Sequence, residues 1–238
     1  HSTPRFSRRP RRPVRAAPLL IALTSAAPLW SDSGQRLEPS DGGFQDRFGW
    51  SVAIQDGVAA VGAPQADADG VIEAGAVYLF ERRPAGGWSE VAKLTAPDPD
   101  LFDEFGAAVS LWGRTLAVGA PGDDDDAVNG GAVYIYERRR GSGGSWRLTS
   151  KLVTADGFGG AFGCAVDLDR RRLVVGTCTV SGNEARAYLF ERRPGFPSAW
   201  ERRRVFLQPE PSGFFGRRVA VSGETVAIGA QLDDDIAQ

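Results

Sequence analysis

Apolar and polar residues alternate in short stretches along most of the chain, and a turn signal follows each stretch. In "FGWSVAI", residues 48–54, every second side chain from Phe48 to Ile54 is apolar, so these side chains would share one face of a strand. The pair Asp56-Gly57 follows, which is favoured in two-residue hairpin turns. No stretch keeps a helical period between capping residues. The pattern predicts an all-β fold of short antiparallel strands.

This arrangement occurs four times. Phe-Gly pairs recur at nearly equal spacings along the chain, and a further glycine follows each pair at one fixed offset. Segments such as "GAVYLFERR", then a Trp and an apolar residue, follow in the first three repeats, so each repeat predicts four strands. The repeated positions are Phe48, Gly49 and Gly62; Phe105, Gly106 and Gly119; Phe162, Gly163 and Gly176; and Phe215, Gly216 and Gly229.

Four antiparallel strands in a repeat of this length are typical of a β-propeller blade. A β-solenoid is the alternative, but its repeats are usually shorter. The Gly- and Ala-rich second strand is expected at an inner position, where backbones crowd near the axis. We predict blades over 48–94, 105–152 and 162–207, a partial blade over 215–238, and a lone strand over 34–38.

The text "FGWSVAIQDGVAAVGAP…GAVYLFER" resembles the FG-GAP repeat of integrin α-subunit propellers. It is still more similar to bacterial-type FG-GAP repeats, in which a Trp and a Lys-Leu pair follow. The resemblance covers residues 34–238. It implies a seven-bladed, usually extracellular propeller that serves recognition more than catalysis, and the chain would then form about three complete blades of the ring.

Charge is distributed unevenly. Residues 1–30 carry six arginines and no acidic residue, and within them a basic segment, an apolar run and small residues follow in the order of a secretory signal. A basic tail is the alternative. The apolar run is too short to span a membrane. Residues 31–238 carry a net charge of −8 against −2 for the whole chain, which argues against nucleic-acid binding. We expect a secreted or cell-surface protein.

Acidic residues gather in the loops that follow the second and fourth strands, which share one end of the blades. Arginine-rich loops lie at the other end, so a charge-polarised molecule is expected, with a protein or glycan partner on the acidic face. Charged loops that are merely solvated are the alternative. The candidate binding residues are Asp67, Asp69, Asp123, Asp124, Asp125, Asp126, Asp233 and Asp234.

The sequence predicts no cofactor, with calcium in the acidic loops as the alternative. In calcium-binding integrin-like repeats the metal loop joins strands one and two, and here those loops are too short, so the family's sites are not carried over. The "DADG" stretch at 67–70 has only part of a calcium-like spacing. The weak calcium candidates are Asp67, Asp69, Glu73, Asp124 and Asp126.

The two cysteines, Cys164 and Cys178, both lie in the third repeat. An even number in an exported chain favours a disulfide. A hairpin turn at Arg170-Arg171 would place them one residue out of register, on opposite faces of the sheet. Two buried thiols are therefore favoured, unless a bulge corrects the register.

No catalytic constellation is recognisable. The one histidine, His1, lies in the leader, so a Ser-His-Asp or Cys-His arrangement cannot form within the repeats. We expect no enzymatic activity and a recognition or adhesion module. A non-catalytic propeller attached to a larger secreted enzyme, and a passive structural repeat, are the alternatives.

Overall fold

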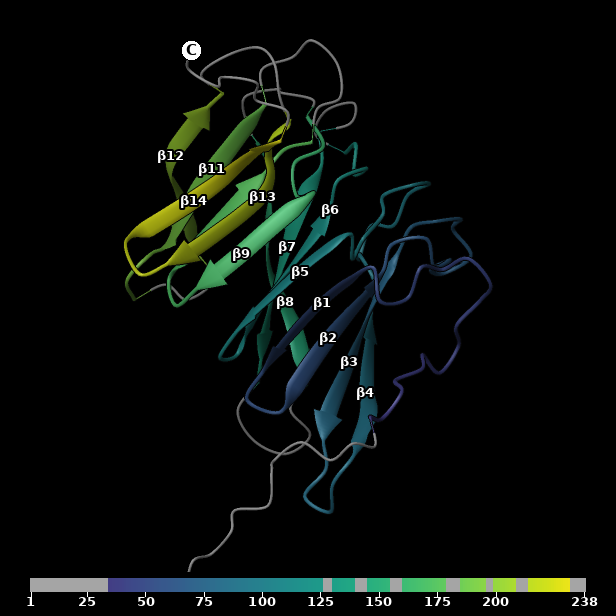
Figure 1. The fold of residues 1–238 in the computed structure, drawn as a ribbon. Helices are drawn as coiled ribbons and strands as arrows, with labels where there is room; N and C mark the ends of the chain where they lie inside the picture. Colours follow the sequence, from purple (N-terminus) through teal and green to yellow (C-terminus); the bar gives the residue numbers. More distant parts are fainter. Residues whose placement is uncertain are drawn as a thin grey trace, which may run out of the picture. The chain divides into compact units, whose positions relative to one another are not determined.

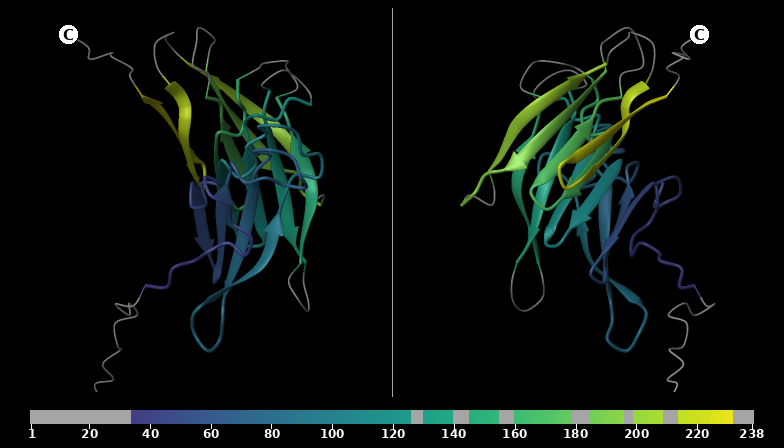
Figure 2. Two further views of the ribbon diagram at one scale, coloured as in Figure 1. Left: turned by 90° about the vertical axis from the view of Figure 1, so that its right-hand side faces the viewer. Right: turned by 60° about the vertical axis from the view of Figure 1, so that its left-hand side comes forward.

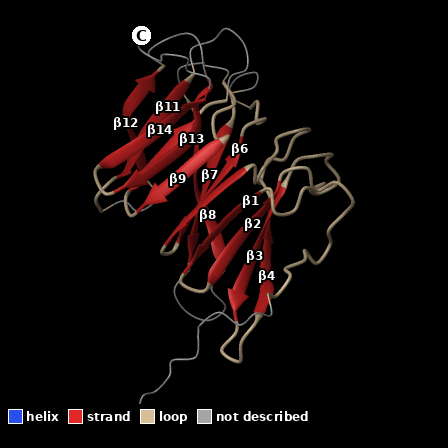
Figure 3. Ribbon diagram, viewed as in Figure 1, coloured by secondary structure: helices blue, strands red, loops and turns tan. Residues whose placement is uncertain are grey.

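A computed structural model describes residues 34–125, 130–139, 145–154, 160–178, 185–195, 199–208 and 214–231. The leader over 1–30 and the candidates Asp126, Asp233 and Asp234 lie outside these residues. The chain divides into two units, His1–Gly34 and Gln35–Gln238, and all the described strands belong to the second. Every regular element in the described residues is a β-strand (Figure 3). The predicted all-β class is confirmed.

The strands form three four-stranded antiparallel sheets and one two-stranded sheet, each ordered as in the sequence (Figure 1). The first blade contains β1 (Ser51–Gln55), β2 (Val58–Ala63), β3 (Ala76–Arg82) and β4 (Trp88–Leu94). The second contains β5 (Ala108–Trp112), β6 (Thr115–Ala120), β7 (Ala132–Arg138) and β8 (Trp146–Leu152). The third contains β9 (Ala165–Asp169), β10 (Arg172–Gly176), β11 (Arg186–Arg192) and β12 (Trp200–Leu207). The fourth sheet pairs β13 (Phe214–Ser222) with β14 (Thr225–Gln231).

The hairpins between first and second strands turn where the sequence predicts. Asp56 and Gly57 have φ angles of 49° and 74°, the left-handed pair that a type I′ turn requires. Gly113, Arg170 and Gly223 take the first turn position in the other sheets, with φ angles of 58°, 53° and 56°. These turns fix the register of each hairpin and therefore which residues face the neighbouring blade.

Two details of the first strands differ from expectation. Gly49 has a φ of 91° and interrupts the alternation, so Phe48 packs against Tyr78 and Phe80 while Trp50 is exposed. The prediction of one apolar face from Phe48 to Ile54 is therefore wrong. The inner position belongs to the first strand and not to the second. Strands β1, β5, β9 and β13 lie next to one another in that order (Figures 1 and 2). Residues of all four strands line one groove.

The glycine of the second strand has a different role, which is contact between blades. A Cβ atom at Gly62, Gly119 or Gly176 would lie 1.8–2.0 Å from the carbonyl oxygen of the Phe-Gly glycine in the next blade. Within its own blade the same residue accepts a hydrogen bond from the preceding Phe-Gly glycine, as Gly119 does from Gly106. The glycine at a fixed offset after each Phe-Gly pair is thus explained by two backbone contacts. One is its hydrogen bond to the Phe-Gly glycine of its own blade, and the other is its close approach to the Phe-Gly glycine of the next blade.

The Phe of each of the first three pairs packs beside the third strand of its own blade. Phe105 lies edge-on to Tyr134 and Tyr136, and Phe162 lies edge-on to Tyr188 and Phe190. Both Phe side chains are fully buried in clusters that combine residues of adjacent blades. Burial between blades, rather than within one sheet, therefore supplies most of the apolar core.

Residues 34–38 form no strand, so the predicted lone strand is wrong. Gln35 instead uses its side-chain amide on the first residue of β4. It donates to the Trp88 carbonyl at 3.0 Å and accepts from the Trp88 amide at 2.6 Å. Leu37 packs on the cluster around Tyr78. A side chain thus replaces the backbone ladder that a strand would have made.

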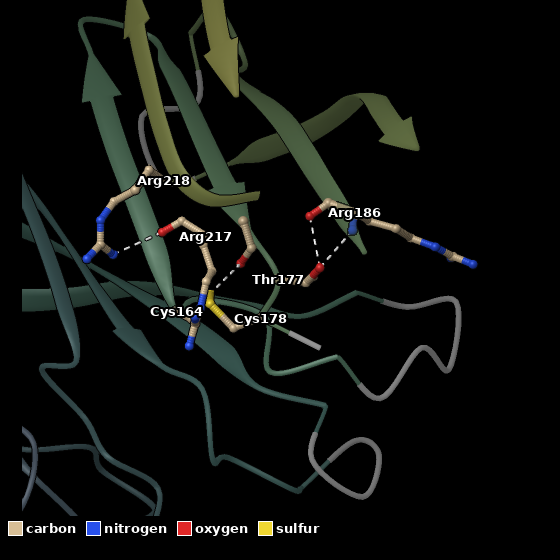
Figure 4. The surroundings of a disulfide bond; sticks show 7 residues. Cys164, Thr177, Cys178, Arg186, Arg217 and Arg218 are labelled. Carbon is tan, nitrogen blue, oxygen red and sulfur yellow. Dashed lines mark hydrogen bonds between the residues drawn. A yellow bond between two sulfur atoms is a disulfide. The ribbon is translucent and has the colours of Figure 1, made fainter. Parts of the chain in front are cut away.

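Cys164 and Cys178 form a disulfide, with Cα atoms 6.0 Å apart (Figure 4). The preference for two buried thiols is therefore wrong. The predicted register is correct, since Ala165 pairs with Gly176, but both cysteines lie just outside the paired strands. The backbone leaves the ladder there, with φ angles of 52° at Ala161 and 96° at Gly163. Side chains alternate between the two faces of a sheet only within paired strands, so this alternation does not separate the two cysteines.

Removing this disulfide is expected to destabilise the third blade. The bond joins residues at a sequence separation of 14, and loops of this size are worth about 3 kcal/mol. The paired Cys164→Ser and Cys178→Ser substitutions should therefore lower the melting temperature, and dithiothreitol should lower that of the wild type alone. Equal melting of the oxidised and reduced wild type would contradict this expectation.

Candidate binding site on the loop face

One end of the blades carries interlocked loops, which we call the loop face. It comprises residues 39–50, 64–75, 95–107 and 121–125, which precede β1, join β2 to β3, join β4 to β5 and begin the link from β6 to β7. Backbone hydrogen bonds join these loops. The amide of Phe102 donates to the Ile72 carbonyl at 3.3 Å, and the amide of Gly122 donates to that of Asp103 at 3.1 Å. The loop face is therefore a connected surface.

The predicted acidic residues divide into two groups here. Asp67, Asp69 and Asp124 are exposed, whereas Asp123 is buried, with 3% of its surface accessible. Asp125 is half-exposed and forms an ion pair with Lys151. A partner could therefore contact Asp124 and Asp125, whereas the side chain of Asp123 is buried inside the protein. Asp123, predicted as a candidate binding residue, has its side chain in the interior and not on the accessible surface.

Asp123 belongs to a network around Lys151. The ammonium lies 2.9 Å from Asp98, 2.9 Å from Asp123 and 2.6 Å from Asp125. The Tyr134 hydroxyl lies 2.7 Å from a carboxylate oxygen of both Asp98 and Asp123. Burial alone would lower the pKa of Lys151, but the three hydrogen-bonded carboxylates outweigh it and raise this pKa. The ammonium group of Lys151 thus links the loop that contains Asp98 to the loop that contains Asp123 and Asp125.

The first blade has a smaller version of the same network. Asp41 accepts hydrogen bonds from Lys93 at 2.7 Å and from the Tyr78 hydroxyl at 2.8 Å. The bond from Lys93 is the main cause of a lowered pKa at Asp41. The sequence analysis missed these tyrosines and lysines. Their signal was available, since Asp41 and Asp98 lie one repeat apart, and a Lys-Leu pair ends the fourth strand of both blades.

Asp103 is a second buried carboxylate on the loop face. Only 2% of its surface is accessible, and one oxygen accepts the Asp100 amide at 2.7 Å. Burial, together with the nearby charges of Asp123, Asp100 and Asp125, raises the pKa of Asp103 to about 6. At neutral pH the folded protein therefore keeps an ionised carboxylate in unfavourable surroundings.

Asp103→Asn is expected to stabilise the protein in a pH-dependent way. A carboxyl group whose pKa rises from 3.8 to about 6 on folding costs stability once the pH passes through that range. The variant should gain up to about 3 kcal/mol above pH 7 and nothing below pH 4 or so. Urea unfolding at both pH values measures this difference. A gain that is the same at both pH values would contradict it.

The structure does not gather the calcium candidates. Asp67 accepts the Glu73 amide at 3.1 Å, and the Glu73 carboxylate accepts the Gln65 amide at 3.1 Å, so these side chains shape their own loop. No group of three or more acidic, histidine or cysteine side chains suited to a metal occurs in the described part of the chain. Asp126 lies outside that part.

Exposed apolar residues form a feature of the loop face that the sequence analysis missed. Ile72, Leu101 and Phe102 expose 55%, 54% and 57% of their surfaces. The hydrogen bond from Phe102 to Ile72 brings their two loops together. We call these three residues the apolar patch. Their signal in the sequence was weak, because single apolar residues in polar loops are common.

Strained backbone accompanies this patch. Outside glycine, positive φ angles occur on the loop face at Gln45 (80°), Arg47 (58°), Asp69 (53°), Glu73 (51°), Phe102 (65°) and Glu104 (55°). Only small polar residues adopt this region readily, so an aromatic residue such as Phe102 is strained there. Strain of this kind concentrates at functional sites, and among the described residues most of the positive φ angles outside glycine lie on the loop face.

The opposite end of the blades is not uniformly basic. Arg138 pairs with Glu81 of the preceding blade, and Arg192 pairs with Glu137 in the same way. Arg172 lies 2.9 Å from Glu191, whose pKa it lowers. The recurring Phe/Tyr-Glu-Arg text thus encodes ion pairs between blades. The predicted polarity of charge does not hold at this end, where arginines and glutamates alternate.

Comparison with protein families shows which family these repeats match. The model of the FG-GAP repeat matches residues 30–80, 88–136 and 210–238, which together are more than half of the chain. The chain belongs to the FG-GAP repeat family. The blade-like sheets described above are consistent with a partial β-propeller of such repeats. No curated protein matches the chain.

The third FG-GAP blade lies between the matched segments, over β9 to β12. Its sequence departs from the others at defined places. Cys178 replaces the Pro of the "GAP" text, Arg170-Arg171 replaces a glycine-containing turn, and Arg186 replaces an alanine. Its strands nevertheless pair in the same order, because the Phe-Gly pair and Gly176 are kept.

Within the residues described, no helix is long and apolar enough to cross a membrane. The loop face thus carries exposed aspartates and an apolar patch, and it is held together by the network of Tyr134, Asp123 and Lys151 and by hydrogen bonds between its loops.

Proposed function

We propose that this FG-GAP chain is a secreted or cell-surface recognition module without catalytic activity, and that its loop face binds a protein partner. The observation that carries the proposal is the apolar patch of Ile72, Leu101 and Phe102, displayed on a strained backbone. The loops of the same face carry exposed aspartates, so a partner segment with basic and apolar side chains fits best.

The apolar patch supports a binding role because its exposed side chains and strained backbone do not stabilise the folded protein. Exposed apolar side chains gain nothing from folding, and a positive φ at Phe102 costs about 1–3 kcal/mol. Two sets of interactions fix the position of the patch. They are the backbone hydrogen bonds between the loops and the ion pairs of Lys151. Contacts with a fixed, partly apolar surface lose less entropy on binding, which favours affinity.

The aspartates support the choice of a basic partner. Asp67, Asp69, Asp100 and Asp124 are exposed, and none forms an ion pair with the described residues. They therefore keep their field toward solvent, where it would speed the approach of a cationic segment. Asp98, Asp123 and Asp125 contribute less, since Lys151 neutralises part of their charge.

An oxidising compartment is supported by the Cys164–Cys178 disulfide. Adhesion is the finer form of the proposal, in which the partner belongs to another cell or to a matrix. A glycan partner is the second candidate, for which the exposed ring of Phe102 could supply a stacking surface. An attached enzyme would leave the role of this loop face unchanged.

The test is binding of the purified chain to an array of short basic–aliphatic peptides, with a glycan array beside it. We expect binding to basic–aliphatic peptides that weakens with added salt and falls roughly tenfold in Leu101→Ser, the loss typical of an interface anchor. Arg83→Gln, an exposed change at the opposite end, is the matched control and should bind as the wild type. Absence of peptide binding, or equal loss in the control, would refute the proposal.

A further inference from the structure

The loop that joins β4 to β5 touches two neighbouring loops. On one side the Phe105 amide donates to the Ala74 carbonyl at 2.9 Å, and on the other the Asp103 carbonyl accepts the Gly122 amide at 3.1 Å. A Cβ atom at Gly122 would lie 1.9 Å from the Phe102 carbonyl oxygen, so the two backbones are in direct contact there. We call this contact of Gly122 with Phe102 and Asp103 the joint. It holds one residue of the apolar patch, so a change in the joint changes how rigidly the patch is held.

A backbone contact of this kind occurs at the same end of three blades. The Asp46 carbonyl accepts the Gln65 amide at 3.2 Å in the first blade, and the Gly160 carbonyl accepts the Cys178 amide at 2.9 Å in the third. Asp46, Asp103 and Gly160 each stand two residues before a Phe-Gly pair. Asp46 is half-buried and Gly160 has no side chain, whereas only 2% of the surface of Asp103 is accessible. Among these three contacts, a carboxyl group is enclosed only at the joint.

The surroundings of the Asp103 carboxyl group are mainly acidic. Within the described residues Asp103 forms no ion pair, and Lys151 binds three other carboxylates instead. One oxygen of Asp123 is buried and has no hydrogen-bond partner among the described residues. The charged groups of this region are Asp100, Asp123 and Asp125, which act on Asp103 directly, Asp98 and Lys151, which belong to the network of Asp123, and Glu104 with its neighbours Glu73 and Arg47.

Ionisation of Asp103 therefore weakens the joint. The bond that Asp103 accepts from the Asp100 amide, at 2.7 Å, lies within its own loop, so ionisation strengthens no contact with the loop that follows β6. Ionisation instead adds a negative charge near Asp123 and Asp125, which belong to that loop. Burial, together with these charges, raises the pKa of Asp103 from 3.8 to about 6 while the joint is closed. An open joint lets water reach the carboxyl group, so loss of its proton favours the open joint as the pH rises from 3.8 towards 6.

We propose that Asp103 makes the joint a pH-sensitive latch, which keeps the Phe102 segment closed in acid and opens more often once the carboxyl group is ionised. The equivalent contacts of the first and third blades do not enclose a carboxyl group and lack this dependence. The latch goes beyond the proposed function, because it is a property of the loops whether or not a partner is bound. It sets how rigidly the apolar patch is displayed at each pH.

The test is amide hydrogen exchange of the purified chain at pH 5 and pH 7.5, followed by NMR and corrected for the intrinsic effect of pH on exchange. The protection of Gly122 should be about tenfold lower at pH 7.5. This is the factor expected for a group whose pKa is about 6 in the closed joint and 3.8 in the open one. Gln65, whose contact contains Asp46 in place of Asp103, should keep the same protection at both pH values.

Two variants separate the latch from a change in overall stability. Asp103→Asn cannot ionise, so Gly122 should be equally protected at both pH values. Asp46→Asn is the matched control, since Asp46 also accepts an amide three residues earlier in the chain, from Gly43 at 2.6 Å. It should leave the pH dependence at Gly122 intact.

Three results would overturn the proposal. The first is equal protection of Gly122 at both pH values in the wild type, and the second is a pH dependence that persists in Asp103→Asn. The third is a loss of protection that Gln65 shares, because the whole protein, and not the joint, would then be loosening.

Discussion

Gly119→Ala is expected to destabilise the protein severely. The new Cβ would lie 1.8 Å from the Gly163 carbonyl oxygen, which is backbone of the next blade and cannot rotate away. The second and third blades must then separate, and the buried cluster around Phe162 loosens with them. We expect a loss on the order of 4 kcal/mol, at the upper end of single-residue effects, and a fall of about 10 °C in melting temperature. Urea unfolding followed by fluorescence measures it.

Gly229→Ala is the matched control for this prediction. Gly229 occupies the same position in the fourth repeat, but its Cβ would lie 3.5 Å from the nearest atom, the Arg218 carbonyl oxygen. The same chemical change should therefore alter stability by less than about 0.5 kcal/mol. Equal effects at the two glycines would show that strand propensity, and not contact between blades, explains the repeat.

Lys151→Met is expected to have the second large effect. The substitution keeps the length of the side chain but removes the charge beside Asp123, whose carboxylate is almost fully buried. Breaking one partner of a buried ion pair leaves an uncompensated charge and costs about 3–5 kcal/mol. Unfolding of Lys151→Met in urea at pH 7 measures this loss. The double variant Lys151→Met with Asp123→Asn should recover a large part of it.

The first blade again supplies the control. Lys93→Met removes the equivalent lysine, but its partner Asp41 has a half-exposed side chain that water can solvate. The loss there should stay within about 1 kcal/mol, as for exposed ion pairs. If the two lysine variants lose the same stability, burial of Asp123 is not the reason for the effect at Lys151.

Local signals in the sequence predicted the strands well. The turns expected at Asp56-Gly57 and Arg170-Arg171 were correct because a two-residue turn depends on its own residues. The Phe-Gly pairs and the glycine at a fixed offset after them revealed the period, and the period predicted the four-stranded blade. FG-GAP membership follows from the same residues.

What the sequence could not reveal depends on contacts distant in the chain. The burial of Asp123 requires Tyr134 and Lys151 to meet it from β7 and β8. The Cys164–Cys178 bond depends on where the ladder ends, which alternation alone does not reveal. The sequence alone does not show that Arg138 and Arg192 of the opposite end form ion pairs with glutamates of the preceding blades. Charge patterns therefore overstated how much of each loop is available to a partner.

The measurement that tests recognition by the loop face most directly is the stability and binding of Phe102→Asn. Asparagine adopts positive φ readily, so the variant should gain about 1 kcal/mol while its binding to basic–aliphatic peptides falls roughly tenfold. Arg170→Asn relieves a similar strain, a φ of 53°, in a hairpin turn at the opposite end and should change stability only. Opposite changes in stability and binding at Phe102 are the result we predict. Unchanged binding in Phe102→Asn would contradict it.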